Sequence, residues 1–547
     1  MKVSKSQCAV VTLVLVVAAG VGNHAFECAA QTANVPTQNK EPARLISAGV
    51  EALERNDLEA ARGFFRQTLA LKPNDVTAHT YLGVIADREG NLGEAERHFA
   101  SAAAADPASP AARNNHGAVL LKLGRVREAA AQFEASLRLD KNQASALVNL
   151  AQIRFSSGTP EDLRAARLLF ERAYTLTPDA EIARALIVIA LRLEDREGAA
   201  TYYGGYSGQP AAANSPANTA TARAELGAAL LEGGLLKQAL TELNAAASAD
   251  PTNRETIVRL AKTYIALSDI PAAGRTLEGA VARGVDSAPI YALLASVYEQ
   301  SGHIENAIPA MRLAIEREPQ SENYRFTYGM MLANSLAPKA AVIRLEEAIQ
   351  LFPRSARLWV ALGIAQFKGG MNDLAATALR RAIELDPKFA PAFAYLGMTR
   401  VEVGDYDEAI KLYEQALAIN EKLGVVDYLI ADVLLRQTGA DAARIEHHLE
   451  RAVKQDPSFV PARLALGTSY ARTNRLAEAA VELEQAIKLD PNLAGAYYQL
   501  GRVYTRLKRA SEAQATLATF KRLSESQKEQ EQNERREIVR RLSNVVF

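Results

Sequence analysis

Small and large apolar residues recur along this chain with a period of 34 residues. The repeats run from about residue 42 to residue 523, and short insertions in some units shift the phase. Within each period the apolar residues are spaced by three and four positions, which places them on one face of an α-helix, and each period holds two such stretches. The recurring residues are Gly49, Gly83 and Gly117, Gly329, Gly363 and Gly397, Gly467 and Gly501, and also Pro73 and Pro107, Pro319, Pro353 and Pro387, Pro457 and Pro491.

One period, residues 460–493, shows the arrangement in full. Its marked positions are Arg463, Leu466, Gly467, Tyr470, Leu476, Ala479, Leu483, Ala486 and Pro491. The small residues let two antiparallel helices approach closely, and the large residues fill the space between them. The proline ends the second helix, because the residue before a proline is disfavoured in the α conformation. The pattern therefore predicts an all-α chain of helical hairpins.

A 34-residue helix–turn–helix period with these positions resembles the tetratricopeptide repeat (TPR) family. The resemblance covers about residues 42–523 and gives about fourteen units, one of them degenerate. It implies a TPR solenoid, a right-handed superhelix of helix–turn–helix units, that binds protein or peptide partners in its concave groove.

Two departures from the period predict how the chain is divided. An N-terminal block of about five units, residues 42–203, ends in a faint unit, and a Gly-, Ser-, Pro- and Asn-rich stretch at 204–219 follows and predicts a linker or loop. Nine units follow at 220–523. The tail, 524–547, places Ile538, Leu542 and Val545 on one helical face. It predicts a helix that caps the last unit, with a partner-binding helix as the alternative.

The N-terminus predicts export. Lys2 and Lys5 precede an apolar run at 9–22, which is shorter than the roughly 20 residues that span a bilayer. A signal peptide at 1–30 is expected, with cleavage after residue 22, 25 or 30 and a periplasmic or secreted product. The alternatives are an uncleaved membrane anchor at 9–22 and, less favoured, a lipoprotein with Cys28 as the lipidated residue.

The composition of the chain argues against several classes of function. The 63 Lys and Arg residues balance the 63 Asp and Glu residues, which argues against a nucleic-acid-binding surface or a basic membrane-binding face. Two cysteines are too few for a disulfide scaffold. Phosphate-binding and zinc-helix motifs are absent from the sequence, and the adjacent His447 and His448 would point about 100° apart on a helix. We therefore expect no cofactor, no metal, no catalytic residue and no enzymatic activity.

By resemblance to the family, the concave groove is lined by fixed positions of each first helix. The Lys and Asn with which some members clamp a peptide carboxylate, at positions 5 and 9, do not occur together in these units. Three zones are expected instead. The amide zone comprises Asn114, Asn115, Asn149 and Gln152; the apolar zone comprises Phe326, Met330, Val360, Ile364, Phe367, Tyr395, Met398 and Tyr428; the basic end comprises Arg472, Arg502 and Arg506. Amides suit a peptide backbone, and an exposed apolar patch is typical of interaction sites. The alternative for the apolar zone is packing between adjacent units.

The function predicted from these observations is an exported, non-enzymatic protein-interaction scaffold. It would bind an extended segment of a partner protein or organise an envelope complex. Two alternatives remain open: a self-associating structural protein, such as a homodimer, and an accessory subunit that presents a substrate to an envelope enzyme. Contact with a membrane is expected only if the N-terminal segment is uncleaved.

Overall fold

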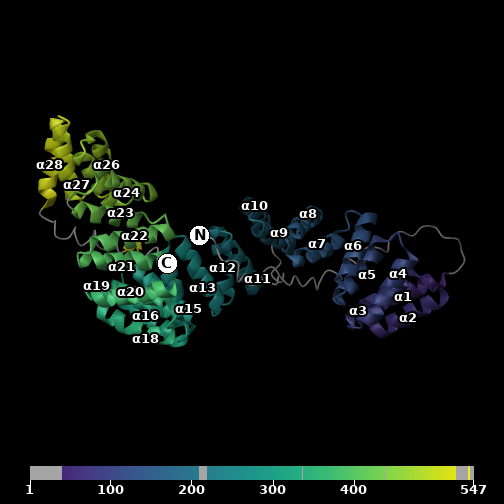
Figure 1. Ribbon diagram of the computed structural model, residues 1–547. Helices are drawn as coiled ribbons and strands as arrows, with labels where there is room; N and C mark the ends of the chain where they lie inside the picture. The colour runs from purple at the N-terminus through teal and green to yellow at the C-terminus, as the bar shows by residue number, and fades with distance from the viewer. Residues whose placement is uncertain are drawn as a thin grey trace. The chain divides into compact units, whose positions relative to one another are not determined.

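The computed structural model describes residues 40–208, 219–335, 337–437, 439–524, 537 and 540–542 (Figure 1). Its contacts divide the chain into two compact units, Met1–Val285 and Asp286–Phe547. The predicted signal peptide at 1–30 lies outside the described residues, as does most of the expected linker. No helix among the residues that are described is long and apolar enough to cross a bilayer.

Fourteen of the described helices belong to the first unit. They are α1 (Glu41–Glu54), α2 (Leu58–Leu71), α3 (Val76–Arg88), α4 (Leu92–Ala105), α5 (Pro110–Lys122), α6 (Val126–Leu139), α7 (Ala144–Ser157), α8 (Pro160–Leu176), α9 (Ala180–Arg192), α10 (Arg196–Ser207), α11 (Ala220–Glu232), α12 (Leu236–Ala249), α13 (Arg254–Ala266) and α14 (Ile270–Ala282).

The second unit also holds fourteen described helices. They are α15 (Ala288–Gln300), α16 (Ile304–Arg317), α17 (Glu322–Asn334), α18 (Pro338–Leu351), α19 (Ala356–Lys368), α20 (Asn372–Leu385), α21 (Ala390–Glu402), α22 (Tyr406–Ile419), α23 (Gly424–Arg436), α24 (Ala442–Gln455), α25 (Val460–Arg472), α26 (Leu476–Leu489), α27 (Ala494–Arg506) and α28 (Ala510–Leu523).

Each odd-numbered helix packs against the even-numbered helix that follows it, and each hairpin packs against the next hairpin in its unit. The glycine of the first helix makes the close approach possible. A Cβ atom at Gly363 would lie 2.6 Å from Cγ of Leu379, and one at Gly117 would lie 2.7 Å from the Phe133 ring. The periodic glycines are therefore required by packing in the hairpins that contain them.

Side-chain caps and left-handed turn residues set the ends of the helices. Asp57, Asp75 and Asn91, for example, each accept a hydrogen bond from a backbone N–H in the first turn of the next helix. The turn inside several hairpins contains a residue with positive φ. This residue is a glycine in most of these turns. The exceptions are Asn56, Glu194 (φ 61°), Ser268, Asn474 and Lys508 (φ 61°).

The faint repeat of the sequence is a complete hairpin, α9–α10. Ile187 takes the place of the usual glycine, and α9 is buried over most of its circumference. Gly204 and Gly205 lie inside α10, so the helix continues into the stretch that was expected to be a linker. Tyr203 and Tyr206 of α10 share a hydrophobic cluster with Leu226 of α11. In the structure, the division between compact units falls after Val285.

The described residues thus form fourteen hairpins and no strand, which confirms the predicted all-α solenoid of about fourteen units.

Candidate protein-binding surface

The amide zone lies on the first helices of two successive hairpins in the first unit, α5 and α7. Asn149 Nδ2 donates a hydrogen bond to Asn114 Oδ1 at 3.3 Å. Asn114 is buried, whereas Asn115, Asn149 and Gln152 are half-buried. The structure therefore brings together amides that lie 35 positions apart in the sequence, at Asn114 and Asn149. Half-buried amides can donate to and accept from a peptide backbone.

The apolar zone is not exposed, and the expectation that its side chains face solvent is wrong. All eight belong to one hydrophobic cluster of the second unit, with exposures from 0 to 8%. They are Phe326, Met330, Val360, Ile364, Phe367, Tyr395, Met398 and Tyr428. The physical reason is that these residues pack into a continuous core, which also contains Leu542 from the C-terminal tail.

Equivalent positions in other hairpins differ from the apolar zone. Val360 and Ile364, at the fifth and ninth residues of α19, are both fully buried. The corresponding Thr80 and Val84 of α3, and Leu464 and Thr468 of α25, are half-buried. Register within the repeat therefore fixes the direction of a side chain, while its burial depends on what covers that stretch of the solenoid.

The basic end divides into two roles. Arg472 and Arg502 are exposed. The Arg502 guanidinium lies 5.6 Å from the ring centre of Tyr498. Arg506 is also exposed, and it donates to Asn474 Oδ1 at 2.8 Å and to the carbonyl of Ala471. Arg506 therefore links the last hairpin to the preceding one, and Arg472 and Arg502 are accessible.

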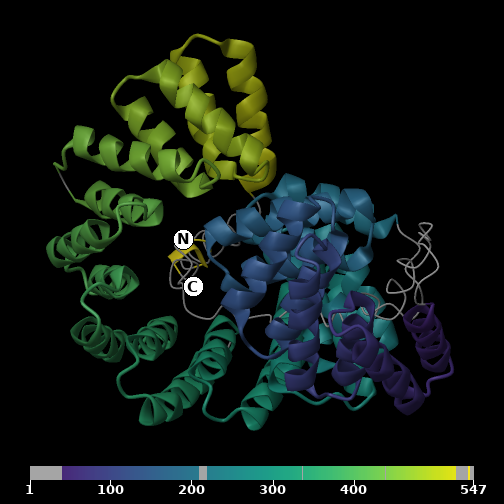
Figure 2. The same cartoon turned by 90° about the vertical axis from the view of Figure 1, so that its right-hand side faces the viewer.

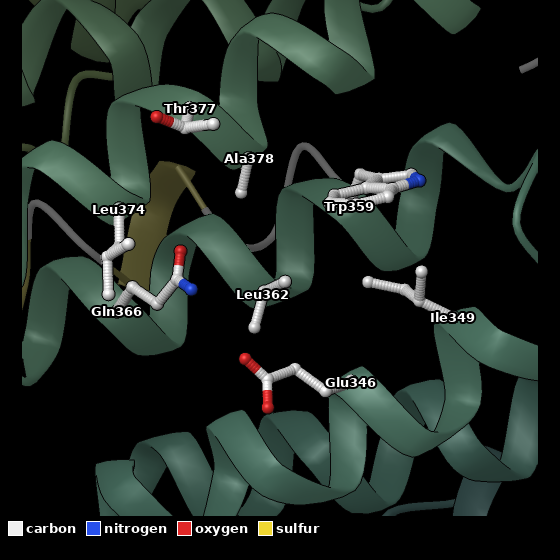
Figure 3. A pocket seen from close by; sticks show the side chains of 8 residues that line it. All are labelled: Glu346, Ile349, Trp359, Leu362, Gln366, Leu374, Thr377 and Ala378. Atoms are coloured by element: carbon white, nitrogen blue, oxygen red, sulfur yellow. The ribbon is translucent and has the colours of Figure 1, made fainter.

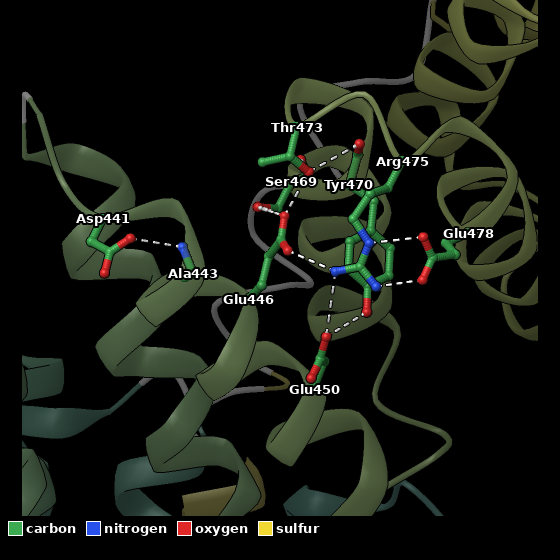
Figure 4. A network of polar contacts seen from close by, with 9 residues as sticks. All are labelled: Asp441, Ala443, Glu446, Glu450, Ser469, Tyr470, Thr473, Arg475 and Glu478. Atoms are coloured by element: carbon green, nitrogen blue, oxygen red, sulfur yellow. Dashed lines mark hydrogen bonds and ion pairs between the residues drawn. The ribbon is translucent and has the colours of Figure 1, made fainter.

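A polar network joins α24 to the next hairpin (Figure 4). Glu446 is 8% exposed; its Oε1 accepts from Thr473 Oγ1 at 2.8 Å, and its Oε2 accepts from Arg475 Nη1 at 2.8 Å. Tyr470 donates to Glu450 at 2.7 Å, and burial together with this hydrogen bond raises the pKa of the Tyr470 phenol. A buried carboxylate with several donors fixes the spacing of adjacent repeats.

A small cavity opens between α18, α19 and α20 (Figure 3). Its volume is about 220 Å³, which is below the usual range of ligand pockets, and Trp359, Leu362 and Leu374 line it. Oε1 of Gln366, also in the lining, is buried without a hydrogen-bond partner. Within the described residues, no cluster of His, Cys, Asp and Glu could hold a metal ion.

Sequence reasoning did not identify Asp456, Phe459 and Arg541. The Arg541 guanidinium pairs with Asp456 and lies 4.6 Å from the ring centre of Phe459. Phe459 in turn makes an edge contact with Tyr428, with ring centres 5.1 Å apart. Leu542 was already expected on the apolar face of the tail, but nothing in the repeat pattern pairs that face with the turn before α25.

Family models for the tetratricopeptide repeat match 46–110, 114–181 and 338–388, a further one matches 230–297, another 390–423, and another 288–321 and 494–527. A model described as TPR repeat matches 467–508. The chain belongs to the tetratricopeptide repeat family. The TPR fold is that of a protein–protein interaction scaffold, and scaffolds of this family are typically non-enzymatic.

Comparison with solved structures finds other helical-repeat proteins. "Crystal structure of APC/C hetero-tetramer Cut9-Hcn1" matches at 15% identity and TM-score 0.37, covering 93% of this chain and 97% of that one. The crystal structure of yeast Tom70 matches at 16% identity and TM-score 0.39, covering 86% of this chain and 95% of that one. YrrB, described as a TPR protein with an unusual peptide-binding site, matches at 23% identity and TM-score 0.30, covering 34% of this chain and 93% of that one. The search of curated proteins found no significant match.

Proposed function

We propose that this TPR protein is an exported, non-enzymatic scaffold that binds an extended protein segment on the first helices of its hairpins. The observation that carries the proposal is the pairing of Asn149 with Asn114 across two successive first helices. This hydrogen bond joins amide groups of α5 and α7.

The chemistry of these amide groups favours binding to the peptide backbone of a partner over binding to a particular side chain. An amide group carries both a donor and an acceptor, as a peptide group does, so Asn115, Asn149 and Gln152 can bond to an extended segment of any sequence. Arg472 and Arg502, exposed in the second unit, add positive charge that suits acidic side chains of a partner. Both features support a protein partner.

Export is part of the proposal and rests on the sequence. Lys2, Lys5 and the apolar run at 9–22 have the order of a signal peptide. Cell fractionation followed by N-terminal sequencing tests it. We expect a mature chain that begins after residue 22, 25 or 30, and a full-length chain in the cytoplasm would contradict export.

The binding surface is tested by matched variants of the full chain. Asn149→Ala with Gln152→Ala removes two amides from α7, and Lys262→Ala changes the ninth residue of α13, the same register as Gln152. Proteins cross-linked to the chain in the envelope fraction are compared by mass spectrometry. We expect the amide variant to lose a partner that the Lys262 variant retains. Equal recovery with both variants would contradict binding at α5 and α7.

A further inference from the structure

The described part of the C-terminal tail packs into the second unit. Leu542 is 1% exposed and belongs to the same hydrophobic cluster as Tyr428 and Tyr395. In Figure 2 a short yellow segment of the tail lies on the inner side of the curve that the green repeats of this unit follow. The tail residue that the sequence placed on an apolar face is therefore a core residue of this unit.

Arg541 makes the specific contacts. Its guanidinium forms an ion pair with Asp456, which ends α24, and lies 4.6 Å from the ring centre of Phe459, which precedes α25. Its Nε also donates to Glu537 Oε1 at 2.7 Å, a spacing of four residues that is typical of a helix. One arginine thus combines a charge-assisted hydrogen bond with a cation–π contact.

The neighbouring arginine provides an internal comparison. The side chain of Arg541 is 19% exposed, whereas that of Arg540 is 67% exposed and forms an ion pair with Glu537 of the same segment. Two adjacent residues of identical chemistry therefore differ in burial and in their ion-pair partners.

Phe459 connects this contact to the apolar zone. Its ring packs edge-on against Tyr428, which lies at the fifth residue of α23, one of the groove positions. A segment held by Asp456 and Phe459 thus reaches the margin of the surface on which TPR hairpins present their first helices.

We propose that the turn between α24 and α25, where Asp456 and Phe459 lie beside Tyr428, is a docking site for an amphipathic helix that carries an arginine followed by a leucine, and that the chain's own tail occupies it. A protein partner with the same pair of residues would compete with the tail. This inference rests on the proposed scaffold function for the existence of such a partner, while the tail contact stands independently.

Tethering explains how a short contact holds the tail. A segment joined covalently to its site has an effective concentration of about a millimolar, so even weak intrinsic affinity fills the site. A free partner helix must therefore bind more tightly than the tail, or the tail must first be weakened.

The test uses full-length chains and a labelled peptide of residues 525–547, measured by fluorescence anisotropy. The acceptors are the unmodified chain, Arg541→Ala with Leu542→Ala, and the matched control Arg540→Ala. We expect the double variant to bind the peptide at least about tenfold more tightly than the other two, because its own tail no longer fills the site. Circular dichroism checks that each acceptor is folded.

A second arm tests the site itself. Asp456→Asn, added to the double variant, keeps the side-chain oxygen that accepts from the Ser458 N–H and removes the charge that pairs with Arg541. We expect weaker peptide binding. Equal binding by all acceptors, or none near millimolar peptide, would overturn the proposal. Loss of the α5 and α7 partner interaction alone would affect only the scaffold function.

Discussion

The first helices α5 and α7 and the first helices α17 to α23 use the same register positions in different ways. Asn114 and Val360 are both the fifth residue of their helix, yet the first forms a hydrogen-bonded amide pair and the second is a fully buried apolar side chain. The difference shows that a groove position in a TPR solenoid specifies a direction, and that neighbouring hairpins or another segment of the chain then determine its exposure.

The strongest test of this comparison moves an amide from one region to the other. In Val360→Asn the new amide replaces a fully buried side chain without a partner such as Asn149, so we expect the variant to lose about 3 kcal/mol of unfolding free energy. Urea denaturation followed by circular dichroism measures the loss. Val148→Asn, at the half-buried fifth residue of α7, is the control and should cost less than about 1 kcal/mol.

The same variant also tests which part of the chain buries Val360 in α19. If the tail contributes to the cover, the cost of Val360→Asn should fall when Arg541→Ala and Leu542→Ala are present, because the amide can then reach water. An unchanged cost would show that adjacent hairpins alone bury this position.

A second prediction concerns a feature that the two regions share. Gly363→Ala places a Cβ 2.6 Å from Leu379, so we expect a loss of about 2 kcal/mol from overpacking. Gly63 lies in α2 with nothing within 4 Å, and Gly63→Ala should stabilise the chain by about 0.5–1 kcal/mol through helix propensity. Thermal unfolding distinguishes the signs. Two changes of the same sign would contradict the assigned register.

Replacing a left-handed turn residue by glycine should have a smaller effect on stability, of equal size in both units. Glu194 and Lys508 have φ of 61° in corresponding turns, a conformation that costs a residue with a Cβ roughly 1 kcal/mol or more. Glu194→Gly and Lys508→Gly should each raise the unfolding free energy by about 0.5 kcal/mol, since the gain is reduced by the larger entropy of the unfolded glycine. Denaturant midpoints measure both, and a destabilised variant would argue against the turn geometry.

The smallest predicted effect is a pH dependence confined to the first unit. His98 Nδ1 lies 3.1 Å from His79 Nδ1, and burial first, then the charge of His79, lower the pKa of His98, while Glu94 opposes the shift. The folded state thus binds fewer protons than the unfolded state, so this stabilisation is complete above about pH 6.5 and is lost as the pH falls.

Urea midpoints between pH 7.5 and 5 measure this effect, and His98→Gln is the control that lacks the titrating ring. Its midpoint should fall less with pH than that of the unmodified chain. Parallel curves for the two proteins would rule out His98 as the source.

The sequence predicted the repeating parts of the structure because each repeats a local requirement. The period, the hairpins and the glycine positions follow from contacts inside one unit, such as Gly363 with Leu379. The burial of Val360 and the pairing of Arg541 with Asp456 did not follow, because they depend on contacts between segments far apart in the chain. The Asn114–Asn149 pair lies between these cases, since it joins equivalent faces of successive repeats.

The glycine contacts also bear on how quickly the chain can fold. Gly363 meets Leu379 only sixteen positions later, and Gly117 meets Phe133 at the same separation. Closing such a short loop costs little entropy, so a hairpin can form early and serve as a template for its neighbours. A chain released from one end can thus acquire structure progressively. The contact of Arg541 with Asp456 spans 85 positions, and so closing it costs more entropy than closing a hairpin.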